Sequence, residues 1–323
     1  MSIGLRRREF IAGAAAWPLV ARAQQPKMPV IGYLSGGNSG SYALPEFHQG
    51  LSQAGYVEGR NVAIEYHWAG LQFNQLPALA EDLVRRQVSV IVANGFPATL
   101  AAKATTTTIP IAFDVGVDPV RVGLIDRLNR PGGNLTGVTV LAQELEGKRV
   151  EMLHEAVPAV TSIVALFDPV EPAGGNPANA INHQLAARAL GLQPQILFER
   201  DIDLIAARLT ELRAGALVFG AGAFTNSLRT QLIALAQSHA LPTIGPGRAW
   251  AVNGSLMSYG ADGRDVPRIV GFYAGHVLKG ERPADLPVQQ ATKVELIINL
   301  KTARALGITV PLTLRAIADE VIE

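Results

Sequence analysis

The chain has 323 residues, of which 48% are hydrophobic and 17% are charged, and it contains no cysteine. This amount of apolar material suffices for two domains with ordinary cores, and disulfide scaffolds, cysteine metal sites and thiol nucleophiles are excluded. Without residues 1–23 the chain loses four of its 28 basic and one of its 27 acidic residues, which leaves 24 against 26, or about −2. At that charge neither a nucleic acid nor an anionic membrane is an expected partner.

Residues 1–23 have the pattern of a secretory signal peptide. A basic cluster at Arg6–Arg8 precedes an apolar run at Ile11–Val20, and Ala21–Ala23 offers small residues for cleavage. The run is too short to span a bilayer as a mature helix. The pair Arg7-Arg8 before Phe10 favours the twin-arginine route, with the general export route as the alternative. We therefore expect a periplasmic protein that is exported and not lipid-anchored, since no cysteine can carry a lipid.

The first half of the mature chain alternates between apolar runs and helical patterns. Strands are predicted at 30–34, 61–68, 88–93, 109–114 and 135–141, and the second of these has the alternation of a strand near a sheet edge. Helices are predicted over 44–55 and 76–84, from Pro97, and from Asp118 through Leu124 and Leu128. Connections this short indicate a parallel sheet covered on both faces.

The same pattern restarts about 130 residues later, without sequence identity between the halves. Strands are predicted at 162–168, 195–198, 216–219, 242–245, 255–260 and 294–299, and helices at 178–190, 202–212, 227–239 and 264–278. These elements exceed what a second lobe needs, so we expect the chain to cross between lobes near 140–145, 250–260 and 288–292. The prediction is an α/β fold of two Rossmann-like lobes with parallel sheets and a three-strand hinge. Lobe 1 would comprise 24–142 and about 258–290, and lobe 2 would comprise 143–257 and about 291–323.

Ligands of open α/β sheets bind beyond the carboxyl ends of the strands, so the candidate site lies in the loops found there. The loop Ser35–Ser41 carries almost no side-chain bulk and leads into a helix, so its backbone N–H groups can face a small polar or anionic ligand. A second loop of this kind follows the strand that ends at Asp168. Aromatic residues near these loops can stack against an apolar ligand body. The candidate ligand-binding residues are Ser35, Gly36, Gly37, Ser41, Tyr42, Asn94, Gly95, Phe96, Asp118, Asp168, Asn176, Phe224, Trp250 and Tyr259.

Each of these residues also has a structural interpretation. Core packing explains an aromatic residue such as Phe96 or Phe224 equally well. Asp118 before Pro119 is typical of a turn or a helix cap. Asp114, at the end of a strand, is a candidate to face the cleft.

Five motifs in order resemble the tryptophan-binding type of ABC-transporter substrate-binding proteins, a bilobal family with the type I periplasmic binding protein fold. The motifs are Gly50–Tyr66, Ile109–Phe113, Asp118–Val120, Arg130–Val138 and Lys279–Pro287. The resemblance covers essentially the whole mature chain. It implies a monomeric periplasmic receptor without a cofactor, which hands a small solute to a membrane permease and its ATPase.

The chain departs from the family pattern in one loop. Amino-acid-binding members carry a sequence like His-Pro-Ala-Leu-Asp after the first strand, and the matching residues here are Ser41–Pro45. A carboxylate there would partner a ligand ammonium group, so its loss argues against an amino acid and makes a carboxylate ligand without an amine more plausible. Glu46, one position later, is a candidate substitute.

Catalytic motifs are absent from the sequence. The six histidines are scattered singly, and the chain has no HExxH, nucleophile elbow, GxGxxG or P-loop lysine pattern. Two hypotheses remain: a periplasmic receptor that closes on a small carboxylate-bearing solute, an amino acid or an aromatic acid, and an exported α/β enzyme that acts on a small organic acid. A transcriptional regulator is excluded because a signal peptide, not a helix-turn-helix, precedes the first strand.

Overall fold

The computed structural model describes residues 28–39, 43–140, 142, 145–168, 176–291 and 293–323. The predicted signal peptide and the candidate residues Ser41 and Tyr42 lie outside this part of the chain. Within it, no helix is both long and apolar enough to cross a lipid bilayer.

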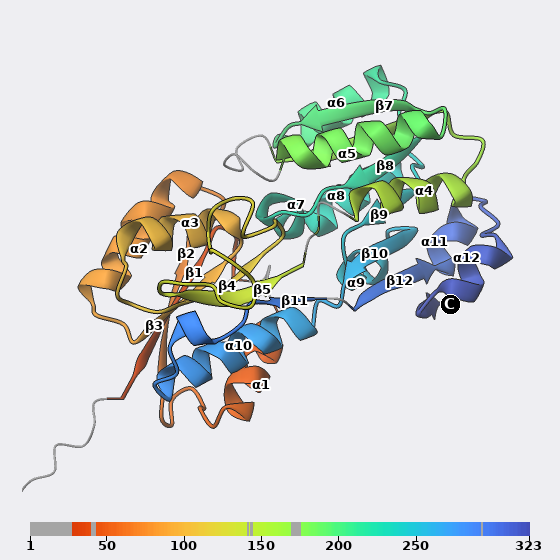
Figure 1. The fold of residues 1–323 in the computed structure, drawn as a ribbon. Coiled ribbons are helices and arrows are strands. Elements are labelled where there is room, and N and C mark those ends of the chain that lie inside the picture. The colour runs from red at the N-terminus through yellow and green to blue at the C-terminus, as the bar shows by residue number, and fades with distance from the viewer. Residues whose placement is uncertain (1–27, 40–42, 141, 143–144, 169–175, 292) are drawn as a thin grey trace, which may run out of the picture.

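Two sheets with their covering helices form two lobes (Figure 1). All strand pairs of the first sheet are parallel. Its order is β11 (Gln289–Gln290), β5 (Leu135–Thr139), β4 (Ile111–Val115), β3 (Val90–Asn94), β1 (Val30–Ser35) and β2 (Ala63–Trp68). The strand predicted near an edge, β2, is the edge strand. We call this sheet and its helices lobe 1.

The second sheet has seven strands and one antiparallel pair, between β10 and β12. Its order is β13 (Glu320–Ile322), β12 (Val294–Asn299), β10 (Met257–Ala261), β9 (Thr243–Gly245), β8 (Ala216–Phe219), β6 (Ser162–Phe167) and β7 (Gln193–Phe198). We call this sheet and its helices lobe 2. The predicted α/β fold of two lobes is confirmed, although the second sheet is not wholly parallel.

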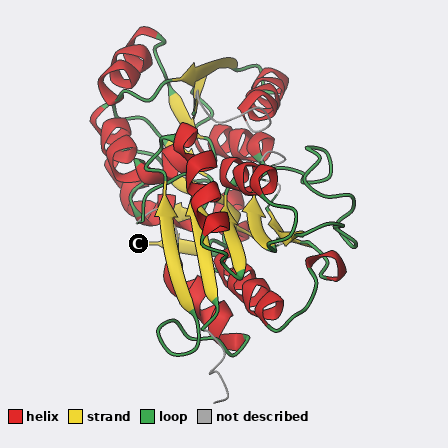
Figure 2. Cartoon of the chain, turned by 90° about the vertical axis from the view of Figure 1, so that its left-hand side faces the viewer, coloured by secondary structure: helices red, strands yellow, loops and turns green. Residues whose placement is uncertain are grey.

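Helices cover both faces of the first sheet (Figure 2). Alternate strand residues point to opposite sides of the sheet, so each face buries a core of its own. Ile91 and Ala93 of β3 pack toward α2 and α3, whereas Val90 and Val92 pack toward α1 and α10. The bounds are α1 (Leu44–Gln53), α2 (Leu76–Arg85), α3 (Phe96–Thr105) and α10 (Asp265–Leu278), with short 3-10 helices η1 (Phe73–Gln75) and η2 (Pro283–Asp285). A proline stands in the first turn of α1, α2 and α3, where its missing N–H costs nothing.

The second sheet is covered in the same way. Ile163 and Ala165 of β6 pack into one core and Val164 and Leu166 into another on the opposite face. The first face carries α4 (Glu146–Ala156), α5 (Asn176–Ala189), α11 (Leu300–Ala305) and α12 (Leu312–Ile317). The second face carries α6 (Ile202–Glu211), α7 (Ala223–Ser227), α8 (Arg229–Ser238) and α9 (Arg248–Val252).

Three segments carry the chain between the two sheets. They connect β5 to α4, β10 to α10 and β11 to β12. The long helix α10 thereby returns to lobe 1, where it lies beside α1 (Figure 1).

The helix predicted from Asp118 through Leu128 is wrong. The segment begins as a single turn, in which Val122 N–H donates to the Asp118 carbonyl, and Gly123 then takes a φ of 70° that ends it. Leu124 and Ile125 are instead buried in the lobe 1 core as part of a turn. Leu128 also packs against this core, so the helical spacing of Leu124 and Leu128 reflects burial and not a helix.

Candidate functional site

A cavity of about 670 Å³ lies between the two lobes. Lobe 1 lines it with the loops that follow β1, β3 and β4, and lobe 2 with those that follow β8 and β9. The crossing segments after β5 and β10 complete the wall. The cavity thus lies at the carboxyl ends of strands from both sheets, so a molecule held there would contact both lobes and the crossing segments.

Five of the candidate residues from the sequence line this cavity. They are Gly36, Asn94, Gly95, Phe96 and Trp250. Ser35 lies just outside the lining and supports it, because its hydroxyl donates to Asn94 Oδ1 at 2.9 Å and accepts from Gly37 N–H at 3.2 Å.

The other candidates that the structure describes lie away from the cavity lining. Asp118 accepts from the N–H groups of Val120 and Arg121, as expected for a turn cap. Phe224 is fully buried in the lobe 2 core, and Tyr259 packs against the core on the opposite face of that sheet.

Two further candidates are placed by their neighbours. Asp168 is buried and pairs with Arg200, with contacts of 2.8 and 2.6 Å. Asn176 is the first residue of α5, and its side chain lies outside the described part of the structure.

Adjacent strands build a polar patch on the lobe 1 wall. Asn94 and Asp114 are register partners on β3 and β4, and Asn94 Nδ2 donates to both carboxylate oxygens of Asp114 at 3.0 and 2.9 Å. Gly95 N–H donates to Oδ1 of the same carboxylate at 3.0 Å. Asp114 is therefore held in place by lobe 1 itself, at the position where the sequence suggested that it faces the cleft.

Lobe 2 contributes one aromatic residue to the described cavity lining, Trp250, which is 1% exposed. The Trp250 ring stacks on Phe219 with centroids 4.3 Å apart, and its Nε1–H donates to Asn226 Oδ1 at 3.3 Å. Phe73 and Phe96 line the cavity from lobe 1. Fixed aromatic faces of this kind suit an apolar or aromatic ligand body.

Sequence reasoning missed most of the charged residues that line the cavity. Three of them, Arg229, Arg248 and Arg264, lie at helix starts, where no spacing distinguishes them from surface charges. These missed residues are Arg149, Arg229, Arg248, Asp262 and Arg264. Three of the four arginines are paired: Arg149 with Glu146, Arg248 with Glu320 at 2.6 Å, and Arg264 with Asp262 at 3.1 Å.

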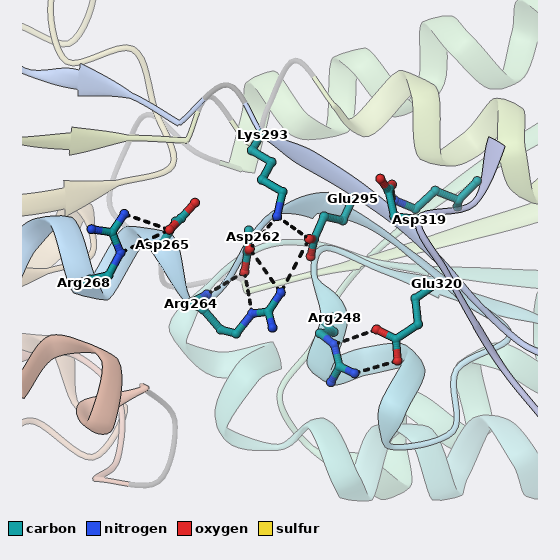
Figure 3. Close-up of polar contacts among 10 residues, drawn as sticks. Arg248, Asp262, Arg264, Asp265, Arg268, Lys293, Glu295, Asp319 and Glu320 are labelled. Atoms are coloured by element: carbon teal, nitrogen blue, oxygen red, sulfur yellow. Dashed lines mark hydrogen bonds and ion pairs between the residues drawn. The ribbon is translucent and has the colours of Figure 1, made fainter. Parts of the chain in front are cut away.

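An ion network joins two of the crossing segments (Figure 3). Asp262 accepts from Arg264 and from Lys293 Nζ at 3.1 Å, and Lys293 also pairs with Glu295 at 2.9 Å. Burial alone raises the pKa of Asp262, but hydrogen bonds from the Arg264 side chain and backbone and from Lys293 lower it to about 2. Asp262 is thus ionised at neutral pH and ties the segment after β10 to the segment before β12.

Comparison with known proteins decides the family. The sequence profile described as "ABC transporter substrate binding protein" matches residues 30–322. The chain belongs to the ABC transporter substrate-binding protein family. The resemblance seen in its sequence motifs is confirmed.

Relatives of this substrate-binding protein include proteins with named ligands. A tyrosine-binding protein of Clostridioides difficile (strain R20291) is 23% identical over 269 residues, which cover 80% of this chain and 75% of that protein. The ABC domain in complex with L-Trp from Streptococcus pneumonia has a TM-score of 0.78 and 25% identity, covering 91% of this chain and 99% of that one. A ligand-free, open substrate-binding protein with adhesive properties from Clostridium difficile has a TM-score of 0.63 and 21% identity, with 91% and 99% covered.

Proposed function

We propose that this substrate-binding protein is an exported, periplasmic receptor of an ABC importer. It binds one small carboxylate-bearing solute, an amino acid or an aromatic acid, in the cavity between its lobes and closes on it by hinge bending. The observation that carries this proposal is the cavity itself, which both lobes and two hinge segments line. The loaded receptor would then deliver the solute to a permease and ATPase in the inner membrane.

The chemistry of the cavity wall supports this ligand class. Its aromatic faces, Phe73, Phe96 and Trp250, suit an apolar body, and its arginines suit a carboxylate. Tyrosine and L-Trp, which are named with two similar proteins, each combine an aromatic body with a carboxylate. We therefore place aromatic amino acids and aromatic acids first among the candidate solutes.

A contact between the two lobes supports the proposed closure of one lobe on the other. Arg200 of lobe 2 donates from Nη1 to the Leu71 carbonyl of lobe 1 at 3.0 Å, while Asp168 holds the other side of its guanidinium. The same guanidinium lies 5.2 Å from the Phe73 ring centroid of lobe 1 and 5.8 Å from that of Phe224 in lobe 2. We call Arg200 and Leu71 the interlobe latch.

The loop that bears the latch carbonyl has a special backbone. Leu71 adopts a φ of 68°, which is uncommon for a residue with a side chain, and its N–H donates to the Gly36 carbonyl at 2.8 Å. Its side chain packs against the lobe 2 core. The strained loop thus joins the cavity residue Gly36 to the opposite lobe.

We expect the double variant Asp168→Asn/Arg200→Gln to bind the solute about 5- to 30-fold more weakly than wild type, because it loses about 1–2 kcal/mol of charged interlobe contact. Changing both partners avoids leaving the buried Asp168 carboxylate without the Arg200 guanidinium. Calorimetry would measure the affinity. Small-angle X-ray scattering without ligand would show a larger radius of gyration for the variant than for wild type. An unchanged affinity together with an unchanged radius would show that the latch plays no part in closure.

The proposed function is tested by a thermal-shift screen of the purified protein against amino acids, aromatic acids and short dicarboxylates, with neutral sugars and polyamines as controls that carry no carboxylate. A solute that binds only the folded state raises stability by about 2.7 kcal/mol at 100 times its Kd, which gives a clear rise in Tm. We expect L-tryptophan, L-tyrosine or an aromatic acid to give the largest rise. If only neutral sugars or polyamines raised Tm, the proposed ligand class would be refuted.

A further inference from the structure

Arg229 differs from the other arginines of the cavity wall. It is the first residue of α8, its side chain lines the cavity, and it has no hydrogen-bond or ion-pair partner among the described residues. Its Nε–H is shielded from solvent and donates to no acceptor among the described residues. By contrast, Arg149, Arg248 and Arg264 each face a carboxylate of the protein itself.

Two features of its position destabilise the charge of Arg229. Its half-buried guanidinium loses water without gaining a counter-ion, and this burial lowers the pKa of Arg229. A cation at the first residue of a helix also faces the positive end of the helix dipole. A bound anion would remove both costs, since it would pair with the guanidinium.

Glu46 is the corresponding charge on the opposite wall. It lies in the first turn of α1, lines the cavity from lobe 1, and makes no side-chain hydrogen bond or ion pair with the described residues. The other carboxylate of that wall, Asp114, already accepts from Asn94 and Gly95. Glu46 is therefore the lobe 1 carboxylate that is available to a ligand.

We propose that Arg229 binds the carboxylate of the solute and that Glu46 binds its amine. This inference rests on the proposed function and assigns the two ends of the ligand to opposite lobes. A zwitterion with an apolar body would neutralise both side chains and link the lobes, whereas an acid without an amine would place its charge near an unpaired Glu46. The cavity therefore selects amino acids over the matching acids and amines, which reverses the expectation drawn from the lost loop carboxylate at Ser41–Pro45.

The test compares three variants, Arg229→Gln, Glu46→Gln and the control Arg208→Gln, by calorimetry. Arg208 is a lobe 2 arginine on α6 that pairs with Glu211 at the surface and lies outside the cavity lining. The probes are L-tryptophan, indole-3-propionate, which lacks the amine, and tryptamine, which lacks the carboxylate. Wild type should bind L-tryptophan more tightly than either analogue.

Arg229→Gln should weaken L-tryptophan and indole-3-propionate about 10- to 100-fold and leave tryptamine unchanged, since a charge-assisted hydrogen bond is lost. Glu46→Gln should weaken L-tryptophan and tryptamine but not indole-3-propionate. Arg208→Gln should match wild type with every probe. Arg229→Gln should also raise the Tm of the ligand-free protein by about 2–4 °C, because it removes an unpaired charge from the cavity wall.

The outcomes distinguish a failure of the Arg229 and Glu46 assignments from a failure of the proposed receptor function. Equal loss of all three probes, or no loss, in Arg229→Gln would overturn the assignment of Arg229 while leaving a receptor that binds them. A lower Tm for ligand-free Arg229→Gln would show that the side chain has a structural role instead. Failure of wild type to bind any of the three probes would overturn this inference, and a hit from another class in the thermal-shift screen would then revise the proposed ligand.

Discussion

Replacement of Arg149 by Met is expected to lower the free energy of unfolding by about 3–5 kcal/mol. Arg149 is 1% exposed and its guanidinium pairs with the fully buried Glu146 carboxylate. Its Nε also donates to the Tyr259 carbonyl at 2.9 Å, and Nη2 donates to the Ala142 carbonyl at 3.4 Å. The variant would leave Glu146 as an uncompensated charge and would remove the side-chain bonds to strand β10 and to the crossing segment after β5. Urea unfolding monitored by circular dichroism measures the loss.

Two controls distinguish the buried pair from an ordinary ion pair. Lys148→Met, one residue away, breaks a half-exposed pair with Glu151 and should cost no more than about 1 kcal/mol. The double variant Glu146→Leu/Arg149→Met should recover most of the stability, because no buried charge remains unpaired. If Arg149→Met cost as little as Lys148→Met, the buried pair would not hold this end of the hinge.

The pH dependence of Arg149→Met gives a further signature. Burial raises the pKa of Glu146 in the folded protein, whereas Arg149 opposes the rise, so removal of Arg149 should raise that pKa further. A folded-state pKa above the unfolded value means that the folded carboxyl binds a proton more readily. Its contribution to stability is then lost as pH rises through that range. The destabilisation of Arg149→Met should therefore be smaller at pH 5 than at pH 8.

Substitution of Gly271 by Ala should destabilise the protein by about 3 kcal/mol, at the upper end of the cost of overpacking. Helices α1 and α10 lie so close that a Cβ atom on Gly271 would stand 2.1 Å from the Phe47 carbonyl oxygen. On the facing helix, a Cβ on Gly50 would stand 1.8 Å from the Arg268 carbonyl oxygen. These contacts are with backbone atoms, so no side-chain rotation can relieve them. Thermal unfolding measures the effect.

The matched control is Gly147→Ala in α4. A Cβ there would meet only the Ala186 Cβ atom, at an ordinary 3.5 Å. Because Ala is a better helix former than Gly, this change should be neutral or stabilise the protein by up to about 1 kcal/mol. Equal effects of the two substitutions would contradict the close packing of α1 on α10.

The sequence predicted the strands and long helices well because each buries a regular pattern of residues. Val88–Ala93 and Ser162–Asp168 read as continuous apolar runs, and both contain central strands that are buried on two faces. The short helices α7 and α9 escaped prediction, since five residues are too few to show a helical period. Gly271 and Gly50 gave no signal, because close helix contact depends on partners far apart in the chain.

The location of the candidate cavity was easier to predict from the sequence than the chemical character of its lining. The rule that ligands bind at the carboxyl ends of strands led to Gly36, Asn94 and Phe96, which line the cavity. It could not separate Trp250, which lines the cavity, from Phe224, which does not, because both follow strand ends in lobe 2 and both are buried in the same core. Arg229 was overlooked because its significance is the absence of a partner, and that is visible only once the neighbouring charges are placed.

Isothermal calorimetry of the purified protein with L-tryptophan, L-tyrosine and their acids without the amine tests the central claim most directly. The receptor proposal predicts saturable binding of one of these solutes with one site per chain, and recovery of that solute unchanged by mass spectrometry. Conversion of the solute to a product would support the alternative of an exported enzyme. Conversion, or the absence of saturable binding by all four compounds, would contradict a receptor for aromatic amino acids and aromatic acids.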